Sequence, residues 1–325
     1  MKNPLISISV AALALAATTG LAFAQEYPKS GKAINIIVPF APGGAADTLS
    51  RLIGQKLSEE WGNPAIVQNK PGADMVIGLQ FVSKAEKDGY TIGLTTSSFA
   101  LNKVVKKDFP VDPIKDFSSI GIVGQSSYVL AVDANSKYKS FKELEAATKE
   151  NKGKYSYASC CFGTYFAAEM IKTATQLDGL HVPYKGSSPA LTAMLSKEVE
   201  YIIDTTTATK PFITSGKLRP LLVTGRKRSL SFPDVPHLTE AGVPGDFEVG
   251  VWYGFVFPAG TPTPIITKVN LALNKILAMP DVKARMEGLD IEVTPTSAEQ
   301  MSQKVISDLD KYVTAAKKAN LNFGN

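Results

Sequence analysis

The sequence predicts an α/β protein built from two lobes. Short apolar runs that suit buried strands alternate with stretches of helical periodicity, a pattern typical of a parallel sheet with helices on its faces. The chain has 325 residues, enough for two domains that each bury a core. No single boundary divides it cleanly, and this favours two lobes joined by more than one crossing over two independent domains in tandem.

Residues 1–24 have the pattern of a cleavable signal peptide. Lys2 gives a positive start, an apolar run extends from Leu5 to Ala17, and Ala22-Phe23-Ala24 is a small-x-small cleavage site. The apolar run is shorter than the roughly 20 residues that a membrane-spanning helix needs. We therefore expect export, with Gln25 as the first residue of the mature chain.

The first strand is expected at residues 34–38, a nearly continuous apolar run of the kind found in buried parallel strands. Further strands are expected at 65–68, 91–95, 119–123, 128–132, 155–158, 181–184, 199–204, 218–224 and 249–257. Residues 225–247 are rich in proline, glycine and charge, so we expect an irregular crossing between the lobes there.

Helical periodicity follows the first strand, with Leu49, Leu52, Ile53 and Leu57 on one face. Other helices are expected at 141–149, 166–175, 188–196 and 264–278. The last helix opens with Ser297 and Gln300 at capping-box spacing. Its predicted apolar stripe consists of Met301, Val305, Ile306, Leu309 and Val313.

Composition excludes several classes of protein. With 44% hydrophobic and 20% charged residues, the chain is ordinary for a globular protein. The net charge of +5 is dispersed, with no basic run longer than residues 226–228, so we expect no nucleic-acid partner. The two histidines, His181 and His237, do not recur with cysteines at metal-ligand spacing, and we expect neither a metal nor a cofactor.

The two cysteines, Cys160 and Cys161, are neighbours in the sequence. An exported protein favours disulfides, but adjacent Cα atoms lie about 3.8 Å apart, below the usual range of about 4.4 to 6.8 Å for a bridge. Two alternatives stay open: a strained vicinal disulfide, or two small apolar side chains that line a loop.

The strongest local signal is a strand, a glycine turn and a helix in direct succession. The turn carries Phe40, Ala41, Gly43, Gly44 and Ala45, and Asp47 and Thr48 follow inside the helix. Such a turn leaves backbone N–H groups unpaired and aimed at one point, where the helix dipole adds positive potential. The motif is neither a P-loop nor a dinucleotide turn. It predicts a carboxylate or phosphate site, although a plain structural turn has the same pattern.

A second turn of the same kind comprises Tyr184, Lys185 and Gly186, followed by two serines and a helix. Amide donors, hydroxyl groups and the lysine all suit an anion. A solvated surface charge is an equally good interpretation of Lys185. Two such turns, one in each lobe, would face each other across a central cleft and hold both ends of a diacid.

Polar residues also follow other strands, and ligands of open α/β sheets collect at the carboxyl ends of strands. We expect these residues to support the site: Thr96, Ser159, Cys160, Thr164 and Asp204. Catalytic machinery is not evident, since neither a G-x-S-x-G elbow nor an H-E-x-x-H motif occurs. A cysteine nucleophile with His181 or His237 as base has no local support, and we expect no enzyme activity.

Several specific runs now make the chain recognisable. In order, they are IIVPFAPGGAADTLSRLIGQKLSEEWG, NKPGA, DGYTIGL, VDPIKDFSSI, HVPYKGSSPALTAML, SGKLRPLLVTGRKRS, PDVPHLTEAGVPG and VFPAGTP. Together they resemble the Bug family, the substrate-binding receptors of tripartite tricarboxylate transporters. The resemblance extends over essentially the whole mature chain.

The resemblance implies a type II periplasmic-binding-protein fold with a central ligand cleft. Lobe one would comprise residues 25–124 and 225–325, and lobe two residues 125–224. It further implies that backbone amides of the turns at 40–45 and 184–186 bind a dicarboxylate, tricarboxylate or aromatic carboxylate. The expected protein is a periplasmic monomer that closes around its ligand and delivers it to membrane subunits of a tripartite tricarboxylate transporter. A sensing subunit for a two-component membrane kinase is the alternative.

Two segments depart from the family pattern. Asp74, Met75 and Val76 stand where the family has further glycine, and residues 159–166 replace a serine- and glycine-rich loop that leads to a histidine. An acidic Asp74 near the cleft would repel a second carboxylate or accept a ligand's amine or hydroxyl. Phe162 and Tyr165 would either stack on an aromatic acid or fill space.

Overall fold

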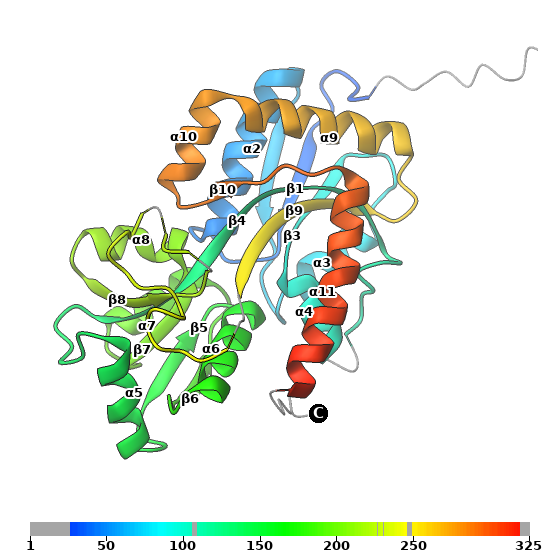
Figure 1. Cartoon of the computed structure of the whole chain (residues 1–325). Helices are drawn as coiled ribbons and strands as arrows, with labels where there is room; N and C mark the ends of the chain where they lie inside the picture. Colours follow the sequence, from blue (N-terminus) through cyan, green and yellow to red (C-terminus); the bar gives the residue numbers. More distant parts are fainter. Residues whose placement is uncertain (1–26, 106–108, 226, 230, 246–248, 319–325) are drawn as a thin grey trace, which may run out of the picture.

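The computed structural model describes residues 27–105, 109–225, 227–229, 231–245 and 249–318. The predicted signal peptide lies outside these residues. The described strands form one continuous sheet in the order β2-β1-β3-β9-β4-β7-β5-β6, with β10 and β8 also paired to β4. Figure 1 shows two halves, and the long strands β4 and β9 run between them.

One half of the sheet combines segments from both ends of the chain. Its strands are β1 (Ile34–Val38), β2 (Ala65–Asn69), β3 (Thr91–Thr96), β9 (Gly250–Pro258) and β10 (Glu292–Val293). The parallel pairs β1–β2 and β1–β3 follow the prediction, but β9 pairs antiparallel with β3. The sheet is therefore mixed, not purely parallel as the sequence suggested.

Helices cover both faces of this half. They are α2 (Ala45–Trp61), α3 (Val76–Ser83), α4 (Ser98–Val105), α9 (Thr263–Ala278), α10 (Pro280–Gly288) and α11 (Ala298–Lys318). In Figure 1, α2, α9 and α10 lie together at the top, and α3, α4 and α11 gather on the right. The stripe predicted for α2 is confirmed, because Leu49, Ile53 and Leu57 are buried and Leu52 packs against the same core.

The other half consists of consecutive sequence. Its strands are β5 (Ser156–Ser159), β6 (Leu180–Pro183), β7 (Tyr201–Thr205) and β8 (Leu218–Val223), and its helices are α5 (Phe141–Glu150), α6 (Phe162–Ala174), α7 (Ser187–Leu195) and α8 (Thr206–Thr214). β5 pairs in parallel with β6 and β7. Helix α6 begins four residues earlier than predicted, because Cys161 and Thr164 form a capping box there.

Strand β4 (Phe117–Asp133) joins the two halves. The sequence predicted two strands, at 119–123 and 128–132, and this was wrong. The intervening Gly124–Ser127 lacks apolar residues but stays paired with β9, up to Ser127 opposite Gly250, and the register shifts twice along the way. Beyond that point β4 pairs with β7 and β8 instead. One strand therefore belongs to both halves of the sheet.

Helix α11 begins as predicted, since Ser297 and Gln300 exchange hydrogen bonds of 2.8 and 3.1 Å. Its predicted stripe was only partly right: Met301 and Val305 are buried, but Ile306 and Val313 are 47% and 37% exposed. Instead, the buried face includes Asp308, whose carboxylate accepts a 2.7 Å hydrogen bond from Trp252 Nε1 of β9. This bond fixes the last helix to a strand that runs between the halves.

We expect Asp308→Ala to lower the free energy of unfolding by about 2 kcal/mol, because it leaves the buried Trp252 N–H without an acceptor. Denaturant unfolding followed by circular dichroism measures the change. Asp310→Ala, on the exposed face of the same helix, is the control and should change stability by less than about 0.5 kcal/mol. Equal effects of the two substitutions would contradict the anchoring role of Asp308.

Candidate functional site

A cavity lies between the two halves of the molecule, and the space in and around its mouth, open solvent included, is about 390 Å³. Its walls come from the β1–α2 turn, the ends of β3, β5 and β7, the start of α7, and strands β4 and β9. The lining residues are Phe40, Ala41, Gly44, Ala45, Ala46, Thr96, Tyr128, Cys160, Cys161, Ser187, Thr205, Val251 and Tyr253. None of these side chains carries a formal charge, so a ligand must be recognised by neutral donors and the backbone.

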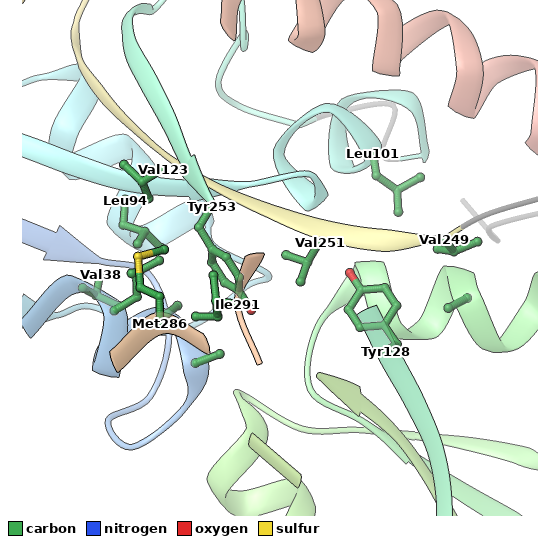
Figure 2. Close-up of a cluster of buried hydrophobic side chains, with 14 of the residues drawn as sticks. Val38, Leu94, Leu101, Val123, Tyr128, Val249, Val251, Tyr253, Met286 and Ile291 are labelled. Carbon is green, nitrogen blue, oxygen red and sulfur yellow. The ribbon is translucent and has the colours of Figure 1, made fainter. Parts of the chain in front are cut away.

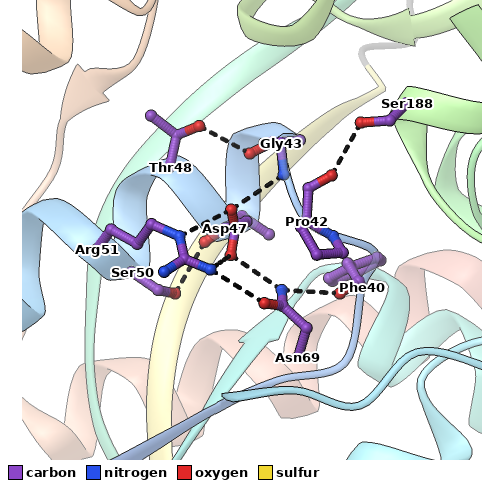
Figure 3. Close-up of polar contacts among 11 residues, drawn as sticks. Phe40, Pro42, Gly43, Asp47, Thr48, Ser50, Arg51, Asn69 and Ser188 are labelled. Atoms are coloured by element: carbon purple, nitrogen blue, oxygen red, sulfur yellow. Dashed lines mark hydrogen bonds and ion pairs between the residues drawn. The ribbon is translucent and has the colours of Figure 1, made fainter. Parts of the chain in front are cut away.

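Asp47 holds the β1–α2 turn in shape (Figure 3). Its Oδ2 accepts hydrogen bonds from the Gly43 amide at 2.9 Å and Arg51 Nε at 3.0 Å, and its Oδ1 accepts one from Asn69 at 2.9 Å. Although burial acts to raise it, hydrogen bonds from these three groups hold the pKa of Asp47 below its ordinary value. The carboxylate therefore stays ionised and fixed to the turn.

Helix α2 begins at this turn without a side-chain cap. Its N-cap is Gly44, and the side chain of Thr48 donates to the Gly44 carbonyl at 3.0 Å instead of capping an amide. Gly44, Ala45 and Ala46 line the cavity. The first-turn amides thus reach the cavity wall without a competing side chain from their own helix.

The second predicted turn meets the first directly. Ser188 Oγ donates to the Pro42 carbonyl at 2.9 Å, as Figure 3 shows, and a Cβ atom built at Gly186 would lie 3.1 Å from the Cβ of Ala41. Gly186 is the N-cap of α7 at φ 143°, a conformation open to glycine alone, and α7 also has no side-chain cap. The two uncapped helix starts therefore meet beside the cavity.

The structure places the predicted residues in two groups. Those that line the cavity are Phe40, Ala41, Gly44, Ala45, Thr96 and Cys160. Those outside the lining are Gly43, Asp47, Thr48, Ser159, Thr164, Tyr184, Lys185, Gly186 and Asp204. Lys185 is exposed and Tyr184 half-buried, so the second turn faces the cavity through Ser187 instead.

Asp204, at the end of β7, lies directly behind the lining. Its Oδ1 accepts hydrogen bonds from Ser187 Oγ at 2.8 Å and the Thr205 amide at 2.6 Å. Burial raises the pKa of this carboxyl to about 6, against the hydrogen bonds that lower it. Its Oδ2 has no hydrogen-bond partner among the residues that the structure describes. A carboxyl group that changes charge near neutral pH therefore supports the cavity wall.

Sequence reasoning missed two lining tyrosines, Tyr128 of β4 and Tyr253 of β9 (Figure 2). Both hydroxyls are buried without a hydrogen-bond partner among the described residues. Burial raises the pKa of both far above the ordinary tyrosine value, so both are neutral O–H donors. The one available signal was a hydroxyl-bearing aromatic residue in each apolar strand pattern: Tyr128 opens the predicted strand at 128–132, and Tyr253 lies inside the one at 249–257.

Cys160 and Cys161 are free thiols, with their Sγ atoms 3.5 Å apart. Thr164 organises them: its Oγ1 accepts hydrogen bonds from both cysteine amides, at 3.1 and 3.2 Å. Of the two alternatives left open by the sequence, the structure has the unbridged pair, and both residues line the cavity.

Phe162 and Tyr165 pack against each other at 5.2 Å, and Tyr165 stacks on His181 at 4.3 Å. Neither lines the cavity, and these two ring contacts fill space within one lobe. The His181 ring also shares a 2.6 Å hydrogen bond with Ser159. Burial also lowers the pKa of His181. The contact and the burial together indicate a structural role for this histidine.

Asp74 also lies outside the cavity lining. It is the middle of three consecutive residues with positive φ, between Ala73 and Met75, and its carbonyl accepts a 2.9 Å hydrogen bond from Asn102. Within the described ranges there is no cluster of three or more potential metal-ligating side chains. In that same part of the chain, no helix has the length and hydropathy required to cross a membrane.

The chain belongs to the tripartite tricarboxylate transporter receptor family (TctC), whose model matches residues 49–321. It is therefore a member of a family of solute-binding receptors of the Bug type, as the sequence runs predicted. The α/β fold of a two-lobed binding protein is confirmed by the similar solved structure of the periplasmic binding protein BugD.

Three solved structures illustrate the likeness. The periplasmic binding protein BugD is 34% identical, with a TM-score of 0.84, over 89% of this chain and 97% of that one. Rpa4515 of Rhodopseudomonas palustris, solved with adipate, is 29% identical (TM-score 0.87; 91% and 99% of the two chains). MatC from the same organism, with bound malate, is 27% identical (TM-score 0.82; 87% and 98%).

In the closed, ligand-free protein, Tyr128→Phe and Tyr253→Phe should each raise the free energy of unfolding by roughly 1 kcal/mol, because each removes a buried hydroxyl that has no partner among the described residues. Tyr157→Phe is the matched control, because its hydroxyl donates to Glu169 at 2.9 Å; it should lower stability by about the same amount. If all three variants lose stability equally, the two cavity hydroxyls are satisfied and the interpretation fails.

The raised pKa of Asp204 predicts a pH dependence. The folded state holds the proton up to about pH 6, whereas the unfolded chain loses it near pH 4. The free energy of unfolding therefore falls as pH rises between these two values. Above this window the ionised carboxyl has lowered it by up to about 3 kcal/mol. Asp204→Asn cannot titrate, so its stability relative to the natural protein should improve between pH 4 and 7 in chemical denaturation. A constant difference across this range would refute the assignment.

Proposed function

We propose that the chain is a periplasmic, non-catalytic receptor that captures a small carboxylate between its lobes. The observation that carries the proposal is the pair of uncapped helix starts, α2 and α7, that meet beside one cavity. Each brings unpaired amides and the positive end of a helix dipole. Two such ends at one cavity favour an anion over a neutral ligand.

The ligand class follows from the cavity. Because its lining has no cation, the negative charge would be stabilised by amides and by neutral hydroxyl donors such as Tyr128 and Tyr253. This arrangement suits a dicarboxylate, tricarboxylate or aromatic carboxylate. Adipate in Rpa4515 and malate in MatC support the dicarboxylate class.

The lobes would close around the ligand about the two shared strands, β4 and β9. We assign residues 25–124 and 225–325 to one lobe and 125–224 to the other, so that the boundaries fall where β4 passes between the halves and after β8. Contacts such as Ser188 to Pro42 form only when the lobes meet. Binding would shift the open–closed equilibrium, and the closed monomer would deliver its ligand to a tripartite tricarboxylate-type membrane transporter.

A thermal-shift panel of the chain from Gln25 onward, with mono-, di- and tricarboxylates of aliphatic and aromatic type, tests the proposal. A ligand at 100 times its Kd should add about 2.7 kcal/mol of stability. We expect a clear shift with at least one class. No shift with any carboxylate would rule the proposal out.

Gly43→Ala should weaken binding of the carboxylate found in this panel about tenfold. A Cβ atom at Gly43 would lie 3.0 Å from Ser188 Oγ and disturb closure, and the residue has φ 87°. Gly31→Ala is the matched control, since Gly31 has φ 78° but nothing within 4 Å of such a Cβ. Calorimetric titration should show weaker binding for Gly43→Ala alone. Equal affinities of both variants would exclude the turn from the closure contact.

A further inference from the structure

The Cys160–Cys161 pair stands apart from the rest of the cavity wall because its two side chains are chemically reactive. They are the chain's only cysteines, both line the cavity, and their sulfur atoms are 3.5 Å apart. A disulfide bond needs about 2.05 Å, so the sulfurs have to approach by about 1.5 Å. Any disulfide within one chain of this protein must join these two residues.

In the reduced state, Cys161 has two structural roles. It is the N-cap of α6, where its sulfur accepts from the Thr164 amide in a capping box. Its sulfur also lies 3.9 Å from Ser98 Oγ of α4, which belongs to the opposite half of the molecule. Ser98 Oγ in turn accepts a 3.1 Å hydrogen bond from the Gly163 amide. The Cys161 thiol therefore takes part in a contact that joins the two lobes beside the cavity.

A bridge between the two sulfurs would disturb these contacts. Cys161 has φ −168° and ψ 174°, an extended conformation that holds its sulfur over the first turn of α6. We expect the movement of this sulfur toward Cys160 to weaken its contacts with the Thr164 amide and with Ser98. A vicinal bridge is also strained, because its Cα atoms are too close for relaxed geometry, and strained disulfides are easily reduced. Such a bridge suits a reversible switch better than a permanent crosslink.

We propose that Cys160 and Cys161 form a reversible vicinal disulfide that loosens the closed state and weakens ligand binding. The oxidant is a low-molecular-weight or protein disulfide. The Cys161 thiolate attacks one of its sulfurs and releases the other as a thiolate, which forms a mixed disulfide. The Cys160 thiol then loses its proton and attacks the Cys161 sulfur, which releases the second thiolate. Two cysteine thiols are oxidised, one disulfide is reduced to two thiols, and no other reactant is consumed.

The redox state of the cysteine pair must affect ligand binding, and ligand binding must in turn affect the redox state. If the bridge lowers ligand affinity, bound ligand must disfavour the bridge by the same factor. The inference depends on the proposed function only through this binding readout. Formation of the bridge and loss of the α6 cap are independent of any ligand.

The chain from Gln25 onward, reduced and then equilibrated with mixtures of reduced and oxidised glutathione, tests bridge formation. We expect both thiols to disappear from thiol titration together, with a mass loss of two hydrogen atoms, and to return when reduced glutathione is in excess. Amide hydrogen exchange at Thr164 should become at least about tenfold faster on oxidation, because its acceptor is withdrawn. Cys160→Ser and Cys161→Ser keep one thiol each and should form only mixed disulfides or crosslinked dimers.

The binding readout uses adipate and malate as probes in calorimetric titrations of the reduced and oxidised protein. We expect the oxidised protein to bind the better probe at least about tenfold more weakly. The Cys160→Ser/Cys161→Ser double variant, whatever its own affinity, should not respond to glutathione.

Three results would overturn the inference: intact thiols or mixed disulfides alone in the natural protein, unchanged Thr164 exchange in a bridged protein, or equal affinity of the two states. If neither probe binds the reduced protein, the carboxylate assignment is at fault. Bridge formation and Thr164 exchange then still decide whether the switch exists.

Discussion

The burial of polar groups on closure is the constraint on which the site depends. Tyr128 and Tyr253 line the cavity with hydroxyls that are buried without partners among the described residues. Each such group costs about 1 to 3 kcal/mol when closure removes it from water. A ligand that supplies the missing hydrogen bonds removes this cost, whereas an empty closed state bears it in full. The same groups therefore recognise the ligand and oppose closure in its absence. The ligand consequently binds the closed state better than the open one, and this difference in affinity drives closure.

The two shared strands make this arrangement possible. β4 pairs with β9 along its first part and with β7 and β8 along its second. Tyr128 begins the part of β4 that pairs with β7, whereas Tyr253 pairs with Thr96 and Gly124 of the other half, so each half of the sheet places one hydroxyl. The bond from Trp252 to Asp308 fixes the last helix to the same segment. Residues from distant parts of the sequence thus converge on one wall of the cavity.

The sequence predicts features that are encoded within a few neighbouring residues. It predicts much less well the features that depend on strand pairing between distant segments. A strand, a glycine turn and a helix in succession identify the turns at Gly43 and Gly186, because the required conformations are encoded within a few residues. Tyr128 and Tyr253 escaped notice because their proximity arises from antiparallel pairing between segments more than a hundred residues apart. The same pairing keeps β4 continuous through Gly124–Ser127, where local composition predicted a break. The stripe of α11 was misjudged at Ile306 for a related reason, since the partners of that helix are distant in sequence.

An acidic residue in the first turn of α2 would at first sight compete with a ligand for the positive end of the helix. Asp47 avoids this competition because its oxygens are occupied by Arg51, Asn69 and the Gly43 amide. The ion pair with Arg51, at 3.0 Å, balances its charge away from the cavity. The carboxylate thus shapes the turn, while Gly44, Ala45 and Ala46 line the cavity. Asp47 therefore shapes the turn without adding an uncompensated negative charge beside the start of α2.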